Sequence, residues 1–141
     1  MKFQKFDDKY IIRIDKNEEV VREIKKFCIQ ENIKLASVSG IGAVKSVALV
    51  FFEPNTKKYK ELTLHKPFEL TNLIGNITTK DGEIYTHFHA TIADTDLRSY
   101  GGHLTHAQVT TTVEVIITPL NGEVERTFNE EVGLNILFKD E

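Results

Sequence analysis

The sequence predicts a single α+β domain, in which one main helix accompanies a mainly antiparallel or mixed β-sheet of about seven strands. Three observations predict this fold class. One amphipathic stretch covers about residues 15–32, and most later segments are rich in β-branched and aromatic residues. Dipeptides that favour tight turns separate several of these segments. Because 141 residues is an ordinary length for one domain, we expect residues 1–141 to form one unit.

The chain begins with a strand and the predicted helix. Residues 9–14, KYIIRI, are typical of a strand. Asp15 can cap the helix that follows, and Glu18 lies three residues later, in the position of a capping box. One face of this helix is apolar. The apolar side chains on it are Val20, Val21, Ile24, Phe27 and Cys28.

From Lys34 onward the pattern favours strands. Asp81-Gly82 is a two-residue turn signal, which predicts a hairpin between residues 74–80 and 83–93. Residues 108–119 predict another strong strand, and Asn121-Gly122 turns the chain before a last one. The remaining predicted strands are LASVSGIGA (35–43), VKSVALVFF (44–52), YKELTLH (59–65), FELTNLIGNIT (68–78) and LNILF (134–138).

The glycine-rich stretch at residues 39–43, SGIGA, does not fit a nucleotide-binding loop. A dinucleotide fingerprint requires a third glycine where this chain has Lys45, and a phosphate loop requires Gly-Lys-Ser/Thr, which is absent. The stretch therefore predicts a tight bend or a bulge between strands.

The charge distribution argues against strong non-specific DNA binding. The net charge is −3, and the basic residues are scattered. Their one local cluster, Lys57, Lys58 and Lys60, is typical of a solvated turn. Strong non-specific binding draws on clustered Lys and Arg that displace counterions from phosphates. Folding or oligomer symmetry could still assemble a basic patch.

Other features of the composition indicate the cellular compartment of the protein and the residue types that could bind a metal. No apolar run is long enough to cross a bilayer, and the start of the chain, MKFQKFDDKY, contains no apolar signal region. We therefore expect a cytoplasmic protein with no membrane partner. Cys28 is the only cysteine, so no internal disulfide forms, and a transition-metal site must use His, Asp or Glu. Cys28 itself is predicted to be a small core residue.

Four of the five histidines lie within residues 82–109. His87 and His89 are one residue apart, and side chains at i and i+2 of a strand point to the same face. If residues 83–93 are extended, the two imidazoles lie side by side and Phe88 faces the core. This spacing suits two ligands of one metal ion.

His103 is the predicted third ligand. It follows Gly101-Gly102, and we expect it to arrive from a loop in which the glycines allow close approach of the backbone. Three imidazoles are typical of a catalytic zinc site whose fourth position takes water or substrate. Another divalent transition metal could use the same ligands. His106 could be a fourth ligand, but a partner of a ligand or a surface role is favoured, and His65 is predicted to be structural or exposed.

Acid–base partners for such a metal are harder to identify. A metal that activates water or polarises a carbonyl usually works with a carboxylate. Glu69 and Glu114 are the best candidates, because an inward carboxylate in an otherwise apolar strand is costly unless it is used or paired. The alternative is that both point outward. Arg98, in the polar loop at 94–100, could bind an anionic substrate group or serve at the surface.

Five segments of the chain resemble the PPC domain (plants and prokaryotes conserved domain). They occur in the family's order and extend over nearly the whole chain, so the set is more specific than any one segment. The segments are SVSGIGAV (37–44), FELTNLIGNI (68–77), HFHATIAD (87–94), GGHL (101–104) and RTFNEEVGLNIL (126–137).

The resemblance implies a stand-alone α+β domain of the prokaryotic type that forms homotrimers. Plant members are DNA-binding proteins of the nucleus in which an AT-hook precedes the domain, and this chain has no such segment. The fold also resembles that of acetolactate decarboxylase, a zinc enzyme with a similar three-histidine site. By position, His87, His89 and His103 match histidines that look like zinc ligands in prokaryotic members. The acid–base residues of the decarboxylase find no match, so its activity does not carry over.

Three functions compete at this point. The favoured one is a zinc-binding PPC homotrimer that acts as a DNA-binding or regulatory module. The alternative is a small zinc-dependent lyase or hydrolase that acts on a carbonyl metabolite, which predicts an open metal in a substrate-sized pocket. The third is a structural metal that steadies residues 94–106.

Overall fold

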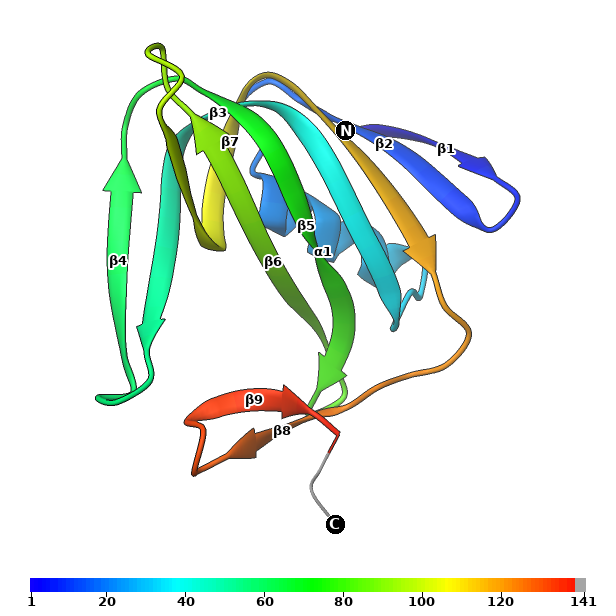
Figure 1. Cartoon of the computed structure of the whole chain (residues 1–141). Helices are drawn as coiled ribbons and strands as arrows, with labels where there is room; N and C mark the ends of the chain where they lie inside the picture. Colours follow the sequence, from blue (N-terminus) through cyan, green and yellow to red (C-terminus); the bar gives the residue numbers. More distant parts are fainter. Residues whose placement is uncertain (139–141) are drawn as a thin grey trace.

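The computed structural model of the chain describes residues 1–138, which form one helix and nine strands. The helix lies behind the main sheet in the view of Figure 1, and a hairpin of the last two strands lies below it. The helix is α1 (Val20–Gln30), and the strands are β1 (Lys2–Phe6), β2 (Lys9–Asp15), β3 (Ala36–Glu53), β4 (Lys58–Leu64), β5 (Phe68–Lys80), β6 (Glu83–Ala93), β7 (Ser99–Pro119), β8 (Arg126–Asn129) and β9 (Leu134–Leu137).

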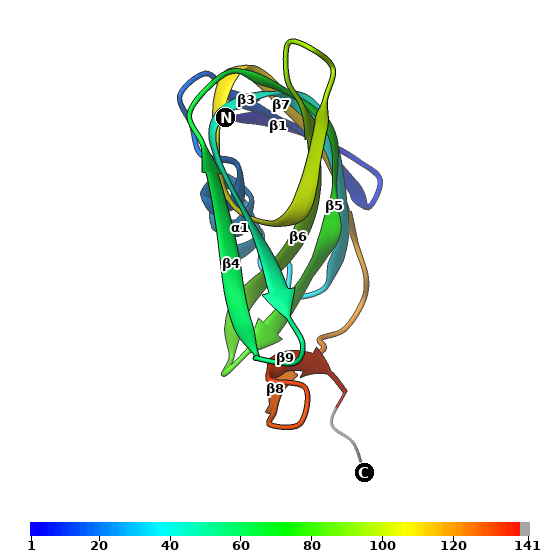
Figure 2. The same ribbon diagram turned by 60° about the vertical axis from the view of Figure 1, so that its left-hand side comes forward.

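The main sheet curls until it closes on itself. Its strand order is β1-β2-β7-β6-β5-β3-β4, and β3 also pairs with β7, so that β7, β6, β5 and β3 form a ring. Every one of these pairings is antiparallel. The length of β7 makes the ring possible, because its residues 99–103 pair with β6 and its residues 103–119 pair along β3. Figure 2 shows the strands curling round. The α+β class and the seven-stranded antiparallel sheet are thus confirmed.

The core lies between α1 and the strands of the sheet. Phe27 is completely buried and makes an edge-on contact with Tyr10 of β2, with ring centroids 5.1 Å apart. Cys28 is also buried, and burial raises the pKa of its thiol to about 12. A thiol that stays protonated is neither a nucleophile nor a metal ligand, so the prediction of a core cysteine is confirmed.

The helix is shorter than the predicted range of about 15–32. Residues 15–18 form a turn instead, in which the Asp15 N–H donates to Glu18 Oε2 at 2.7 Å and Asn17 has a φ of 70°. The Asn17 N–H donates to Val109 O at 2.9 Å, so β7 holds this segment outside the helix. Asn32 has a φ of 53°, which ends the helix at the other side. Within residues 1–138, no helix is long and apolar enough to cross a membrane.

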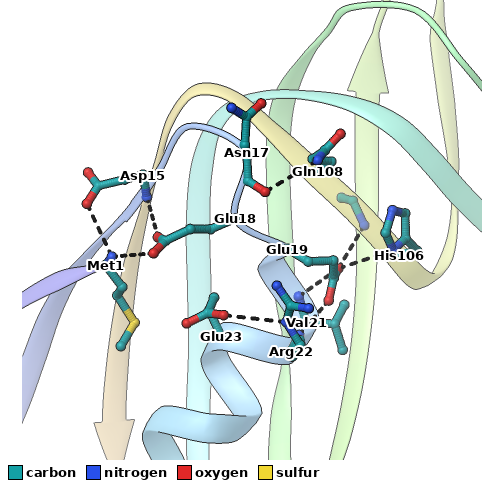
Figure 3. A network of polar contacts seen from close by, with 11 residues as sticks. Met1, Asp15, Asn17, Glu18, Glu19, Val21, Arg22, Glu23, His106 and Gln108 are labelled. Atoms are coloured by element: carbon teal, nitrogen blue, oxygen red, sulfur yellow. Dashed lines mark hydrogen bonds and ion pairs between the residues drawn. The ribbon is translucent and has the colours of Figure 1, made fainter.

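Glu19, and not Asp15, caps the helix. Its carboxylate accepts hydrogen bonds from the N–H groups of Val21 and Arg22 at 3.1 and 2.7 Å (Figure 3). The Ala107 N–H of β7 donates to the same carboxylate at 3.0 Å. A negative charge at a helix N-terminus is favourable. This one residue therefore both starts α1 and ties it to the strand that carries His103.

The strands differ from prediction at β3, at β7, which begins at Ser99, and at the unpredicted β1 and β8. The two segments predicted at 35–43 and 44–52 form the single strand β3, and the glycine-rich stretch is a bulge where its pairing with β5 shifts between Gly40 and Gly42. A Cβ on Gly42 would lie 2.4 Å from Thr112 O, so glycine is needed for this approach of β3 to β7. The predicted hairpin at Asp81-Gly82 is present, with Lys80 paired to Glu83. The short strands β1 and β8 carry no pattern that predicts them.

Gly75 is expected to be essential for the packing of β5 against β6. A Cβ there would lie 2.0 Å from His87 O and 2.7 Å from a ring carbon of Phe88. Gly75→Ala should therefore lower the free energy of unfolding in urea by at least about 2 kcal/mol. Gly101→Ala is the matched control, because its Cβ would meet atoms no nearer than 3.5 Å. A loss in Gly75→Ala no larger than in Gly101→Ala would contradict this packing.

The loop between β6 and β7 is organised by one buried carboxylate. Asp94 is 6% exposed, and its Oδ1 accepts from the N–H groups of Asp96 and Arg98 at 3.0 and 3.1 Å. Its Oδ2 accepts from Lys66 Nζ at 3.1 Å. The Lys66 ammonium, and then the two backbone N–H groups, hold the pKa of Asp94 below its ordinary value of 3.8. The ionised carboxylate thus fixes the turn that leads into β7.

Asp94→Asn should change the pH dependence of stability. Because the pKa of Asp94 is lower in the folded chain, its contribution is complete above 3.8 and is lost as the pH falls through the lower folded value. The melting temperature of the wild-type chain should therefore exceed that of Asp94→Asn near neutral pH, and the gap should narrow in acid. Asp96→Asn is the control, since Asp96 is exposed and its carboxylate lies 3.9 Å from the Arg98 guanidinium, its one ion-pair partner among residues 1–138. A gap that does not change with pH would refute this role.

Candidate metal centre

Three histidines from two paired strands meet on one face of the sheet. His87 and His89 lie on β6, where Phe88 between them is 1% exposed and points into the core. His103 lies on β7 as the direct pairing partner of His89. It does not arrive from a loop, because β7 already begins at Ser99 and runs through both glycines. Strand pairing, and not a flexible bend, brings the third imidazole to the first two.

The geometry of the three imidazoles suits one metal ion. A nitrogen from each of His87, His89 and His103 lies within 4.8 Å of the others. Their ring centroids are 5.3, 5.2 and 5.6 Å apart. His87 and His103 are half-buried and His89 is exposed. Three converging imidazoles match the ligands of zinc and of similar transition metals, with further positions left for water or a ligand.

Burial and neighbouring groups keep the rings of His87 and His103 neutral. Burial, followed by the positive charge of Arg126, lowers the pKa of His87 to about 4. Burial, followed by His89, also lowers the pKa of His103. Neutral imidazole is the form that binds a metal, so His87 and His103 are ready for a cation at neutral pH.

A cavity of about 400 Å³ opens beside the histidines. This volume falls within the range of roughly 300–1,000 Å³ that is usual for small-molecule sites. Its walls come from β3, β4, β6, β7 and the β8–β9 hairpin. The lining residues besides the histidines are Val50, Phe51, Phe52, Tyr59, Tyr85, Gly102, Arg126, Leu134 and Asn135.

Arg126, at the start of β8, is a residue of this cavity that the sequence reasoning missed. Its side chain donates three hydrogen bonds of 2.9 Å, from Nε to Thr78 Oγ1, from Nη1 to Asn135 O and from Nη2 to Asn76 Oδ1. Nη2 also lies 3.4 Å from His87 Nδ1, which is long for a hydrogen bond. The segment RTFNEEVGLNIL, which belongs to the family resemblance, begins with this residue and is the one signal that points to it.

The other predicted site residues lie elsewhere. Glu69 and Glu114 are exposed in the single chain and do not line the cavity. Arg98 is exposed in the loop before β7, 3.9 Å from Asp96. His65 is exposed, with Nδ1 3.4 Å from Ser46 Oγ. His106 lies outside the metal group of residues 1–138, and its Nδ1 is 3.8 Å from the helix-capping Glu19 (Figure 3).

Comparison with known proteins identifies the family. Residues 1–121 match the family model of the Plants and Prokaryotes Conserved (PCC) domain, the PPC domain of the resemblance above. The chain belongs to this family. Among curated proteins, none matches the chain.

Two solved structures of this PPC fold are each 34% identical to the chain. The first is from Bacteroides thetaiotaomicron and is described as a candidate DNA-binding protein, with a TM-score of 0.95 over 97% of this chain and 96% of that one. The second is from Archaeoglobus fulgidus and is described as metal-containing, with a TM-score of 0.89 over 99% of this chain and 100% of that one.

A third structure confirms the predicted likeness to acetolactate decarboxylase at the level of the fold. The enzyme from Bacillus subtilis is 16% identical, with a TM-score of 0.55 over 82% of this chain and 54% of that one. At this identity the likeness concerns the fold and carries no residue roles.

Proposed function

We propose that this PPC protein holds one divalent transition metal ion on His87, His89 and His103, with zinc as the first candidate. The convergence of the three ring nitrogens within 4.8 Å carries the proposal. The metal-containing relative from Archaeoglobus fulgidus, 34% identical over nearly the full chain, supports it. The position of the site beside a cavity of about 400 Å³ favours a metal that is open to a small molecule over a closed structural one.

Such a site suits chemistry on a carbonyl compound, and we propose a lyase or hydrolase reaction of this kind. A bound divalent ion would supply polarisation of a carbonyl oxygen or an acidified water. The chain itself supplies aromatic side chains along the walls of the cavity. No carboxylate of residues 1–138 lines the cavity, so proton transfer would fall to its two tyrosines, Tyr59 and Tyr85.

Elemental analysis of protein purified without a histidine tag tests the metal. The expected result is close to one transition-metal ion per chain, removable by a chelator and restored by zinc. A chain that stays free of metal after incubation with zinc, nickel and cobalt would overturn the proposal.

We further propose a homotrimer, as the family resemblance implies. A row of exposed isoleucines crosses neighbouring strands of the sheet, since Ile11 pairs with Ile116, and both Ile116 and Ile74 pair with Ser39. These three side chains are 45–55% exposed in the single chain. Ile74 also pairs with His89, so a protomer on this face would lie beside the candidate metal site.

The mass of the particle in sedimentation tests the assembly. We expect three chains per particle, and dissociation in Ile116→Lys, because a buried lysine without a partner opposes association. Leu97→Lys is the control, since Leu97 is 80% exposed in the loop before β7. A monomeric wild-type chain at micromolar concentration would exclude the trimer.

A second candidate function is a DNA-binding or regulatory module, favoured by the description of the relative from Bacteroides thetaiotaomicron. The net charge of −3 weighs against it. A gel-shift assay with duplex DNA decides between the two. Binding should be present at low salt and weaken steeply as salt rises. If the duplex stays unshifted even at low salt, direct DNA binding is excluded.

A further inference from the structure

The cavity beside the histidines contains a buried positive charge. Arg126 is 6% exposed, yet none of the Asp and Glu side chains of residues 1–138 forms an ion pair with it. Burial of a charge is unfavourable unless an opposite charge or a full set of hydrogen bonds compensates it. Asn76, Thr78 and Asn135 supply neutral acceptors only.

The hydrogen bonds of Arg126 leave donors unused. A guanidinium has five N–H groups. Protein acceptors at 2.9 Å take the Nε–H and one N–H on each terminal nitrogen. One further N–H on each terminal nitrogen is left without a protein acceptor at hydrogen-bonding distance. The other contacts of the guanidinium among residues 1–138 are the long one of 3.4 Å with His87 Nδ1 and a stacking contact with the Tyr85 ring, whose centroid is 5.0 Å from Arg126 Cζ. Guanidinium N–H groups of this kind match the oxygens of carboxylate and phosphate.

A second polar group at the cavity is also unmatched. Asn135 lines the cavity, and its Oδ1 is buried without a hydrogen-bond partner among residues 1–138. Buried polar atoms are nearly always hydrogen-bonded in folded proteins. Two unmatched polar groups on one wall point to a polar ligand, whereas the aromatic side chains of Phe51 and Tyr59 on the other walls suit its carbon skeleton.

We infer that the cavity binds a small molecule through an oxyanion, a carboxylate or phosphate, which pairs with Arg126 while the rest of the molecule extends toward the three histidines. The inference deepens the proposed function by naming the charge of the substrate. It rests on that function for the role of the metal, but the contact of the oxyanion with Arg126 requires no metal ion. Arg126, and not the exposed Arg98, is the anion-binding arginine of this chain.

Calorimetric titration tests the inference with three probes: lactate, its neutral analogue lactamide, and inorganic phosphate. Each is titrated into chelator-treated and zinc-loaded protein. Lactate should bind in both states, more tightly than lactamide, and Arg126→Gln should weaken it by about tenfold or more. Arg98→Gln is the matched control, since Arg98 is exposed and does not line the cavity, and it should bind lactate as the wild type does. Comparison of lactate with phosphate shows which oxyanion the site prefers.

A measurement on the wild-type chain covers the case in which Arg126→Gln fails to fold. The Nε–H resonance of Arg126 in an ¹⁵N-labelled sample should shift on addition of lactate or phosphate and stay in place with lactamide. Equal binding of lactate and lactamide, or an Arg126 resonance that no anion moves, would overturn the inference. If the chain binds lactate through Arg126 but takes up no metal, the proposed function fails and the anion site stands. If the chain binds zinc but shows no preference for lactate over lactamide, the anion site fails and the proposed metal site stands.

Discussion

Replacing His103 with alanine should lower the affinity for zinc by about 100-fold to 1,000-fold. Structural zinc sites bind with apparent free energies of about 10–16 kcal/mol shared among four ligands, so that one imidazole accounts for about 2.5–4 kcal/mol. His103 is the one member of the three-histidine group on β7, and the pair on β6 cannot reproduce its position. Competition with a chromogenic chelator measures the loss.

His65→Ala is the matched control for this prediction. His65 is exposed and lies outside the group of three, and its ring nitrogen Nδ1 lies 3.4 Å from the Ser46 hydroxyl. It should leave zinc affinity unchanged. His103 is half-buried with a neutral ring, so its loss should alter the folded stability of the metal-free chain little. Equal zinc affinity in His103→Ala and the wild type would remove β7 from the site.

Much of this site follows from the local sequence. In the segment HFH, the period of two that defines a strand places His87 and His89 on one face and Phe88 on the other. The turn signal Asp81-Gly82 fixes where β6 begins. The local sequence alone therefore determines that His87 and His89 share one face of the strand. Position in the chain cannot show what His103 pairs with, and the two glycines before it favoured a loop over the strand that forms.

Arg126 shows where local pattern ends. Its hydrogen-bonding partners Asn76 and Thr78 on β5 are 50 and 48 residues away, and His87 is 39 residues away. Only the folded chain brings these groups together. β8 pairs with β9 in a separate two-stranded sheet, so no strand pairing with β5 or β6 could be expected to place Arg126 beside them. A short strand of four residues has too few positions for an alternating pattern to predict it.

The start of the helix was missed for a related reason. The Glu18 carboxylate accepts from the Asp15 N–H, as in a capping box, but the Glu18 N–H donates to the backbone carbonyl of Asp15 and not to its carboxylate. The two residues therefore close a turn before the helix. Two backbone hydrogen bonds to β7 favour this turn: the Asn17 N–H donates to Val109 O, and the Val109 N–H donates to Glu18 O. Tertiary contact therefore overrides the local capping signal, and Glu19, whose carboxylate also reaches Ala107, becomes the cap.

The largest loss of stability is expected at Phe88. Its ring is 1% exposed, and it occupies the space that the missing side chain of Gly75 leaves on β5. Phe88→Ala should lower the free energy of unfolding by about 3–5 kcal/mol. Urea unfolding of the metal-free chain measures this loss. Phe6→Ala is the matched control, because Phe6 on β1 is 49% exposed and its removal leaves no cavity in the core.

Phe88 also links the core to the candidate metal centre. It is the residue between His87 and His89, so the depth at which its ring packs sets the height of both imidazoles above the sheet. Phe88→Leu keeps much of the apolar volume and should cost about 1 kcal/mol of stability while zinc affinity stays near that of the wild type. In Phe88→Ala, β6 should collapse into the space that the ring leaves in the core. This shift of the strand should weaken zinc binding even under conditions where the chain is fully folded. Zinc titration of both variants below their unfolding transitions separates the effects, and an unchanged affinity in Phe88→Ala would show that strand pairing alone positions the histidines.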